Sequence, residues 1–242
     1  MDVTQLILSA LAALVALTIH EFAHGYTAYK LGDDTAKLHG RLSLNPIKHL
    51  DLYGVLCMML FHFGWAKPVP IDPRNFKNPR RGFALTALAG PAINLIIAFF
   101  TSFLYLLCLT TFRETNVAFI NNLEVNTLLF LFYSFSINIG LGVFNLIPLP
   151  PFDGSRILNV VLPDRLYFKI MRYERHIYWG VIAWLLLGHY VYSALISIPA
   201  IASNQVLSSF VRIFSLSDII SDTINAIANW MLSFWRLIPT FR

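Results

Sequence analysis

Long apolar runs without charged side chains dominate the sequence. A helix needs roughly 20 apolar residues to cross about 30 Å of hydrocarbon. Four uncharged runs reach or approach that length, at 3–19, 83–112, 125–152 and 177–211, and the last of them contains His189. We expect the first run to be retained as a membrane helix. The pattern predicts a polytopic α-helical membrane protein.

A fifth apolar run, 52–66, is shorter. Its 15 residues lie between Asp51 and Lys67 and include His62. As a helix they would cover only about 22 Å, at about 1.5 Å per residue. We therefore expect this run to be re-entrant, interfacial or a short buried helix rather than a membrane span.

The C-terminal part has a different pattern. Ile220, Ile224, Ile227, Met231 and Phe234 recur at spacings of three and four, with polar residues between them. This spacing predicts an amphipathic helix. Such a helix lies along the membrane surface or packs against the bundle.

Charged residues make up 13% of the chain, about half of what an ordinary soluble domain carries. The net charge is +5, and the basic residues gather in loops at 67–81 and 156–175. Loops rich in Lys and Arg face the cytoplasm. The sequence therefore predicts a multi-pass protein of the cell membrane with both loops on the cytoplasmic side. Basic residues that flank membrane runs argue against a nucleic-acid partner.

One motif carries chemistry. His20, Glu21 and His24 form an H-E-x-x-H pattern at the end of the first apolar run. Residues four apart share a helix face, so the two imidazoles can bind one Zn²⁺ while the glutamate lies beside them. Ionisable residues within a membrane helix are costly and mark a functional site by default. The two cysteines, Cys57 and Cys108, both lie in apolar runs, so any metal is held by histidines and carboxylates.

A catalytic zinc needs a third protein ligand. The position six residues after His24 holds Lys30, and the first glutamate after the motif is Glu114. Asp153 stands out because it follows a long apolar run in a segment with three prolines, and broken backbone at membrane depth is tolerated where it lines a site. A helix-ending turn at the interface is the alternative interpretation. The acidic candidates are Asp33, Asp34, Asp51, Asp72 and Asp153.

The predicted topology tests whether Asp153 can reach the two histidines. If the loop at 67–81 is cytoplasmic, the runs 83–112 and 125–152 cross outward and back, which places Asp153 at the cytoplasmic end. His20 and His24 reach the same end only if the first helix also runs inward. The run 52–66 then cannot cross, in agreement with its length.

Three segments together resemble the site-2 protease family of intramembrane zinc metalloproteases. They are HEFAH at 20–24, AGPAIN at 89–94 and NLIPLPPFDGSRIL at 145–158. The likeness covers roughly 20–158 and looks most like the compact bacterial branch, which lacks an appended PDZ or CBS domain. The resemblance implies one Zn²⁺ per chain, with His20, His24 and Asp153 as ligands and Glu21 as the general base.

The resemblance also implies a three-helix catalytic core and further site residues. Asn145, eight residues before the aspartate, would hold the substrate carbonyl or its oxyanion. For Asn94 two interpretations stay open, a similar role or a hydrogen bond across packed helices beside Gly90 and Pro91. Part of 30–70 would form a small membrane-associated β-sheet whose edge pairs with an extended substrate, and 37–44 is compatible with a strand.

These features divide the chain into two parts. We expect an intramembrane zinc metalloprotease core at 1–158, with a cytoplasmic-face insertion at 31–82. The part at 159–242 would add one further transmembrane helix and the amphipathic helix. The remaining histidines form no second spaced pair, and we expect packing or interface roles for His39, His49, His62, His176 and His189.

The implied function is hydrolysis of peptide bonds within or near transmembrane segments, that is, regulated intramembrane proteolysis of a single-span membrane protein in the lipid bilayer. The alternative is a non-proteolytic zinc-binding membrane protein, either a transporter or a scaffold. That alternative gives Glu21 no necessary role and leaves Asn145 without one. A membrane zinc protease that processes prenylated proteins would be expected to use a glutamate as its third ligand.

Overall fold

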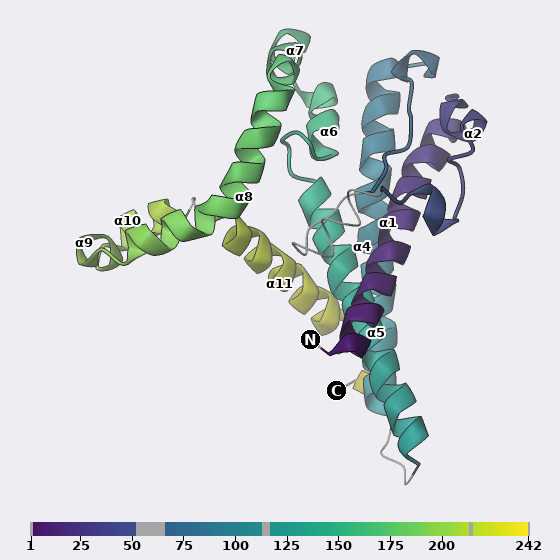
Figure 1. Cartoon of the computed structure of the whole chain (residues 1–242), viewed down its shortest axis with the longest axis vertical. Helices are drawn as coiled ribbons and strands as arrows, with labels where there is room; N and C mark the ends of the chain where they lie inside the picture. Colours follow the sequence, from purple (N-terminus) through teal and green to yellow (C-terminus); the bar gives the residue numbers. More distant parts are fainter. Residues whose placement is uncertain (1, 52–65, 113–116, 213–214, 242) are drawn as a thin grey trace.

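The computed structural model describes residues 2–51, 66–112, 117–212 and 215–241. The described residues are mostly helical, and Figure 1 shows helices α1, α4 and α5 packed along one another. The membrane-length helices have the bounds α1 (Val3–Lys30), α4 (Pro79–Thr111) and α5 (Ala118–Asn145). These three are long and apolar enough to cross a membrane, as judged from the described residues. They confirm a polytopic helical membrane protein.

Polar side chains are buried inside this three-helix bundle, and large apolar side chains are exposed on its outer surface. Asn94 and Asn138 are 0% and 1% exposed, whereas Phe100 and Phe119 are 58% and 75% exposed. A soluble bundle has the opposite distribution, because apolar surface exposed to water is unfavourable. The arrangement fits helices whose outer surface is solvated by lipid.

Helix α4 runs antiparallel to both α1 and α5. His20, in the second half of α1, lies beside Asn94 in the first half of α4. Asn94 in turn contacts Asn138 in the second half of α5. The end of α1, the start of α4 and the end of α5 therefore meet at one end of the bundle, as the predicted topology required.

Shorter helices complete the described structure. Asn78 caps the start of α4 by accepting a hydrogen bond from the backbone N–H of Arg81, and Pro79 takes the first helical position. After α5 the chain turns at its prolines and continues through shorter elements. The remaining helices are α2 (Thr35–Leu38), η1 (Pro46–Lys48), η2 (Pro73–Asn75), α6 (Gly154–Val161), α7 (Asp164–Arg172), α8 (Glu174–Ile196), α9 (Pro199–Ala202), α10 (Gln205–Val211), α11 (Leu216–Trp235) and η4 (Pro239–Phe241).

The predicted fourth span, 177–211, does not form one helix. Helix α8 ends at Ile196, and the chain continues as the short helices α9 and α10. Pro199 lacks the N–H that a continuing helix would need and takes the first position of α9 instead. The further transmembrane helix stays a prediction, with α8 as its candidate.

The predicted β-sheet insertion is unsupported. In the described part of 30–70 the only strand-like pairing is an isolated antiparallel bridge between Leu50 and Ala66. Within 37–44, Leu38 closes helix α2 and Gly40 turns the chain with a φ of 64°, a conformation incompatible with a strand. The predicted re-entrant run 52–66 lies almost entirely outside the described residues.

The predicted amphipathic helix is present as α11. Figure 1 shows it running from the α8 end of the molecule to the bundle, and it contacts α4, α5 and α8. Met231 packs with Ala98, Phe135 and Ile139 in a buried cluster. The indole N–H of Trp235 donates to the hydroxyl of Ser102 at 2.9 Å. Of the two placements predicted for this helix, the described contacts show packing against the bundle.

A buried carboxylate organises the segment between α1 and α4. Asp33 is fully buried and accepts hydrogen bonds from the backbone N–H of Asp72 at 2.8 Å and the side-chain amide of Asn75 at 2.8 Å. It also accepts two bonds from Thr35. Burial alone would raise the pKa of Asp33, but the side-chain bonds from Thr35 and Asn75 and the backbone bonds lower it below its usual value. The ionised form therefore stabilises the fold.

We predict that Asp33→Asn destabilises this segment, by about 1 to 3 kcal/mol for the mismatched buried group. Because the folded pKa is below the unfolded one, the ionised Asp33 contributes fully above about pH 4 and loses its contribution as the pH falls through the folded pKa. Hydrogen exchange of the backbone amides of residues 66–78, followed from pH 6 to 3, measures the loss of this stabilisation. Protection that declines equally in the wild type and Asp33→Asn would contradict the assignment.

Candidate metal centre

Three of the predicted site residues meet at one end of the bundle. The Nε2 atoms of His20 and His24 are 3.0 Å apart, and they lie 3.1 and 3.2 Å from Oδ2 of Asp153. His20 and His24 are 4% and 6% exposed, while the Asp153 side chain is 24% exposed. The group is therefore buried on the side of the helices and open on the side of the aspartate.

The protonation of the imidazoles makes this group suitable for a cation. Nδ1 of His20 lies 2.5 Å from Oδ1 of Asn94, and Nδ1 of His24 lies 2.7 Å from the carbonyl oxygen of Thr86. Each Nδ1 thus donates a hydrogen, and in a neutral imidazole, the form that binds metal, this leaves Nε2 as the lone-pair atom. Both Nε2 atoms then turn lone pairs toward each other and toward the carboxylate of Asp153.

Three acceptors that face one another without a hydrogen between them repel unless a cation lies among them. Ligand atoms about 2.1 Å from a tetrahedral zinc are about 3.4 Å apart, close to the 3.0 to 3.2 Å found here. Two imidazoles and one carboxylate also leave a fourth position for water or substrate, as catalytic zinc sites do. The donor set fits zinc.

The close approach of α4 to the histidines depends on Gly90. A Cβ atom at this position would lie 2.5 Å from Nε2 of His24 and 2.6 Å from Cε1 of His20. Only a residue without a side chain allows the helix to pack directly on the two imidazoles. The glycine of the AGPAIN segment therefore belongs to the wall of the site.

Asp153 is positioned by the turn after α5. It occupies the N-cap of α6, but its side chain makes no capping bond and points to the histidines instead. Gly154 lies so close to the end of α5 that a Cβ atom would be 2.4 Å from the carbonyl oxygens of Leu146 and Ile147. The glycine thus lets the turn fold back tightly enough to bring the carboxylate to the histidines.

Glu21 lies next to the ligands on α1. Its Oε2 atom accepts a hydrogen bond from the backbone N–H of Val69 at 3.0 Å. The guanidinium of Arg41 donates to the carbonyl oxygens of Lys67 and Pro68, which fixes the same segment. The segment before α4 therefore contacts α1 next to His20 and orients the side chain of Glu21.

Of the two predicted asparagines, Asn94 contacts a predicted ligand directly. It bonds to Nδ1 of His20 and across the bundle to Asn138, which agrees with the interpretation as a hydrogen bond between packed helices. Asn145 ends α5, eight residues before Asp153, and its amide donates to the carbonyl oxygen of Leu141 at 3.0 Å.

The other acidic and histidine candidates that the structure describes are not part of the group, and His62 lies outside the described residues. Among the described residues only His20, His24 and Asp153 come close enough to share a metal ion. Asp33 is bonded to Thr35 and Asn75, and Asp72 to Arg74. His49 is buried against the carbonyl oxygen of Ser43.

Sequence reasoning missed two groups at the site, Thr86 and Asn138. Thr86 contributes a backbone carbonyl, which leaves no signal in the sequence. Asn138 was detectable, because a buried amide in the middle of a membrane helix is costly unless it is bonded.

The comparison with family models decides the assignment. The model of Peptidase family M50 matches residues 8–188, three quarters of the chain. The chain belongs to Peptidase family M50. This is the family of the site-2 proteases, so the protein is an intramembrane zinc metalloprotease. The transporter or scaffold alternative is not favoured.

Curated M50 relatives agree with this membership. YwhC of Bacillus subtilis, named as a proposed zinc metalloprotease, is 44% identical over 72% of this chain and 76% of its own. Rip2 of Mycolicibacterium smegmatis, also named as a proposed zinc metalloprotease, is 31% identical over 60% of this chain and 54% of its own. Zinc metalloprotease MJ0392 of Methanocaldococcus jannaschii is 29% identical over 62% of this chain and 33% of its own. None of the solved structures matches the chain significantly.

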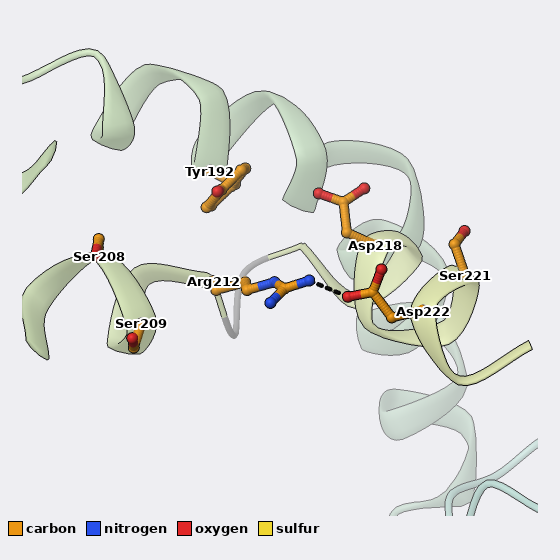
Figure 2. Close-up of a pocket in the computed structure, with 7 residues that line it drawn as sticks. All are labelled: Tyr192, Ser208, Ser209, Arg212, Asp218, Ser221 and Asp222. Carbon is orange, nitrogen blue, oxygen red and sulfur yellow. Dashed lines mark hydrogen bonds and ion pairs between the residues drawn. The ribbon is translucent and has the colours of Figure 1, made fainter. Parts of the chain in front are cut away.

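This M50 chain also has a hollow between α8, α10 and α11. Figure 2 shows it with the guanidinium of Arg212 directed at the carboxylate of Asp222. Its volume is about 480 Å³. The described lining contains none of the predicted site residues, so this hollow is separate from the metal centre. It consists of Tyr192, Ser208, Ser209, Arg212, Asp218, Ser221 and Asp222.

We predict that Gly90→Ala in this M50 protein lowers zinc affinity by at least about 10-fold, because the new methyl group displaces the two imidazoles on which the metal depends. Zinc content after dialysis against a chelator measures the effect. Gly180→Ala in α8 is the matched control, since its Cβ would meet nothing within 4 Å. Equal zinc retention in the two variants would show that α4 does not form the wall of the metal centre.

Proposed function

We propose that His20, His24 and Asp153 hold the catalytic zinc, that Glu21 is the general base and that Asn145 donates to the oxyanion of the substrate. The convergence of three lone-pair atoms within 3.0 to 3.2 Å supports the ligand set. When bound, zinc acts as a Lewis acid that lowers the pKa of water to about 7 and polarises a carbonyl.

The role proposed for Glu21 is to move the proton of the attacking water. The N–H of Val69 bonds to one carboxylate oxygen and fixes the orientation of the group. The second oxygen can accept a proton from water and deliver it to the leaving nitrogen of the peptide bond. General acid–base catalysis of this kind contributes about 10²- to 10⁴-fold.

The role proposed for Asn145 is to stabilise negative charge on the substrate. Its amide has two N–H groups, and one of them donates to Leu141. The other is available to the oxyanion that develops when the peptide carbonyl is attacked. A donor already held by its own helix loses little entropy at that moment.

The substrate we propose is a single-span membrane protein in the lipid bilayer. His20 and His24 lie on α1, a helix of membrane length, and Asp153 lies in the turn that follows α5, so we propose that the peptide bond is cleaved at or near membrane depth. We further propose that the protein lies in the cell membrane with its active site toward the cytoplasm. The basic residues before α4 and along α6 to α8 lie next to the helix ends that form the metal centre. Basic residues beside membrane helices face the cytoplasm.

We predict that Glu21→Gln retains zinc and loses at least about 10²-fold in cleavage rate, because glutamine keeps the size of the side chain but cannot accept the proton. The assay uses purified protein in detergent, a generic single-span substrate and mass spectrometry to locate the cut.

Three outcomes separate the possible functions. Zinc retained with cleavage lost supports Glu21 as the base. Chelator-insensitive cleavage, or a wild type that binds zinc and cleaves none of several substrates, contradicts the proposal and favours a metal-handling role. A wild type without zinc contradicts the ligand set.

We predict that Asn145→Ala lowers kcat by about 10- to 10³-fold and leaves the zinc content unchanged, because an oxyanion donor acts in the transition state rather than on the metal. Steady-state kinetics with the same substrate measure kcat and KM. Asn121→Ala, at the opposite end of α5, is the matched control. A variant in which only KM rises would assign Asn145 to ground-state binding of the substrate.

A further inference from the structure

A chain of buried amides connects α5 to the metal centre. The side-chain amide of Asn138 donates to the carbonyl oxygen of Ser134 at 2.8 Å, and its Oδ1 accepts from the amide of Asn94 at 2.7 Å. Oδ1 of Asn94 in turn accepts from Nδ1 of His20. Asn94 and Asn138 are 0% and 1% exposed. The chain therefore runs through the bundle without help from bulk water.

Two backbone carbonyls set the direction of the chain. A carbonyl oxygen can only accept, so the side of Asn138 that faces Ser134 must be the NH₂ group. The NH₂ group of Asn94 likewise faces the carbonyl oxygen of Ala16 at 3.4 Å, as well as Oδ1 of Asn138. Reversing both amides would place oxygen against oxygen at Ser134 and at Ala16. The oxygen of Asn94 is therefore the atom that faces His20.

We infer that Asn94 and Asn138 are positioning residues that hold the proton of His20 on Nδ1, so that Nε2 presents its lone pair to the zinc. A reversed Asn94 would direct its NH₂ at Nδ1 and make that nitrogen an acceptor. The proton would then move to Nε2, the atom that faces His24 and Asp153, and metal binding would require its removal. This inference rests on the proposed ligand set.

The role of Asn138 distinguishes this inference from simple support of a ligand. Asn138 touches neither histidine through any bond that the described residues show, and it acts only through the orientation of Asn94. An asparagine amide by itself has two nearly isosteric orientations. Asn138 adds the acceptor that selects one of them.

The test compares three variants with the wild type in the full-length protein. Asn138→Leu removes the acceptor and should lower zinc affinity by about 10-fold, at the lower end of the effects seen for groups that support a metal ligand. Asn138→Asp should bind zinc nearly as the wild type does, because a neutral carboxylic acid offers an acceptor to Asn94 and a donor to Ser134. Ser102→Ala is the control, because it removes a buried polar group on α4 that is not part of the chain of buried amides.

Two readouts are measured for each variant. Competition with a chelator gives the dissociation constant for zinc. The ¹⁵N shifts of the His20 ring in the metal-free protein, at a pH where the ring is neutral, report which nitrogen carries the proton. We expect Nδ1–H in the wild type, Asn138→Asp and Ser102→Ala, and a mixture of the two tautomers in Asn138→Leu.

Several results would overturn the inference. One is Nε2–H in the metal-free wild type, which needs no variant and so stands even if Asn138→Leu does not fold. Another is Asn138→Leu with unchanged zinc affinity, and a third is weakened affinity with an unchanged tautomer, which indicates a merely structural role. Because the tautomer is read without metal or substrate, loss of proteolysis or of zinc binding in the wild type would count against the proposed function and not against the positioning of the His20 proton by Asn94 and Asn138.

Discussion

The structure depends on one electrostatic constraint, the confinement of three lone-pair atoms in a largely apolar bundle. Nε2 of His20, Nε2 of His24 and Oδ2 of Asp153 lie within 3.2 Å of one another. Bulk water that would otherwise solvate these groups is excluded on the side of the helices. The same constraint that makes the group unfavourable by itself makes it selective for a small divalent cation with nitrogen and oxygen ligands.

Helix packing maintains this confinement. Gly90 removes the side chain that would separate α4 from the imidazoles, and Gly154 lets the turn after α5 fold back to deliver Asp153. The groups behind the ligands, Asn94 and the carbonyl of Thr86, satisfy the Nδ1 atoms and so aim the opposite nitrogens inward. Buried polar groups are tolerated inside the bundle because their partners are also inside it.

Elements outside the three-helix bundle support the same end of the molecule. The carboxylate of Asp33 ties the segment before α4 to the end of α1, and that segment presents the N–H of Val69 to Glu21. On another side, α11 packs against α4 and α5 through Met231 and Trp235. Glu21 is thus oriented by a backbone N–H of the segment before α4, whereas His20 and His24 are oriented by groups on α4.

The sequence by itself predicted the three membrane helices, the His20–Glu21–His24 motif and the approach of Asp153 to the two histidines, because helical periodicity, apolar length and short motifs are local properties. It did not determine the break of 177–211, the absence of the expected strand at 37–44, or the part played by Asn138. Those outcomes depend on which groups meet across the fold. An amide buried between helices and a backbone carbonyl such as that of Thr86 acquire their roles only from long-range packing, which no local pattern encodes.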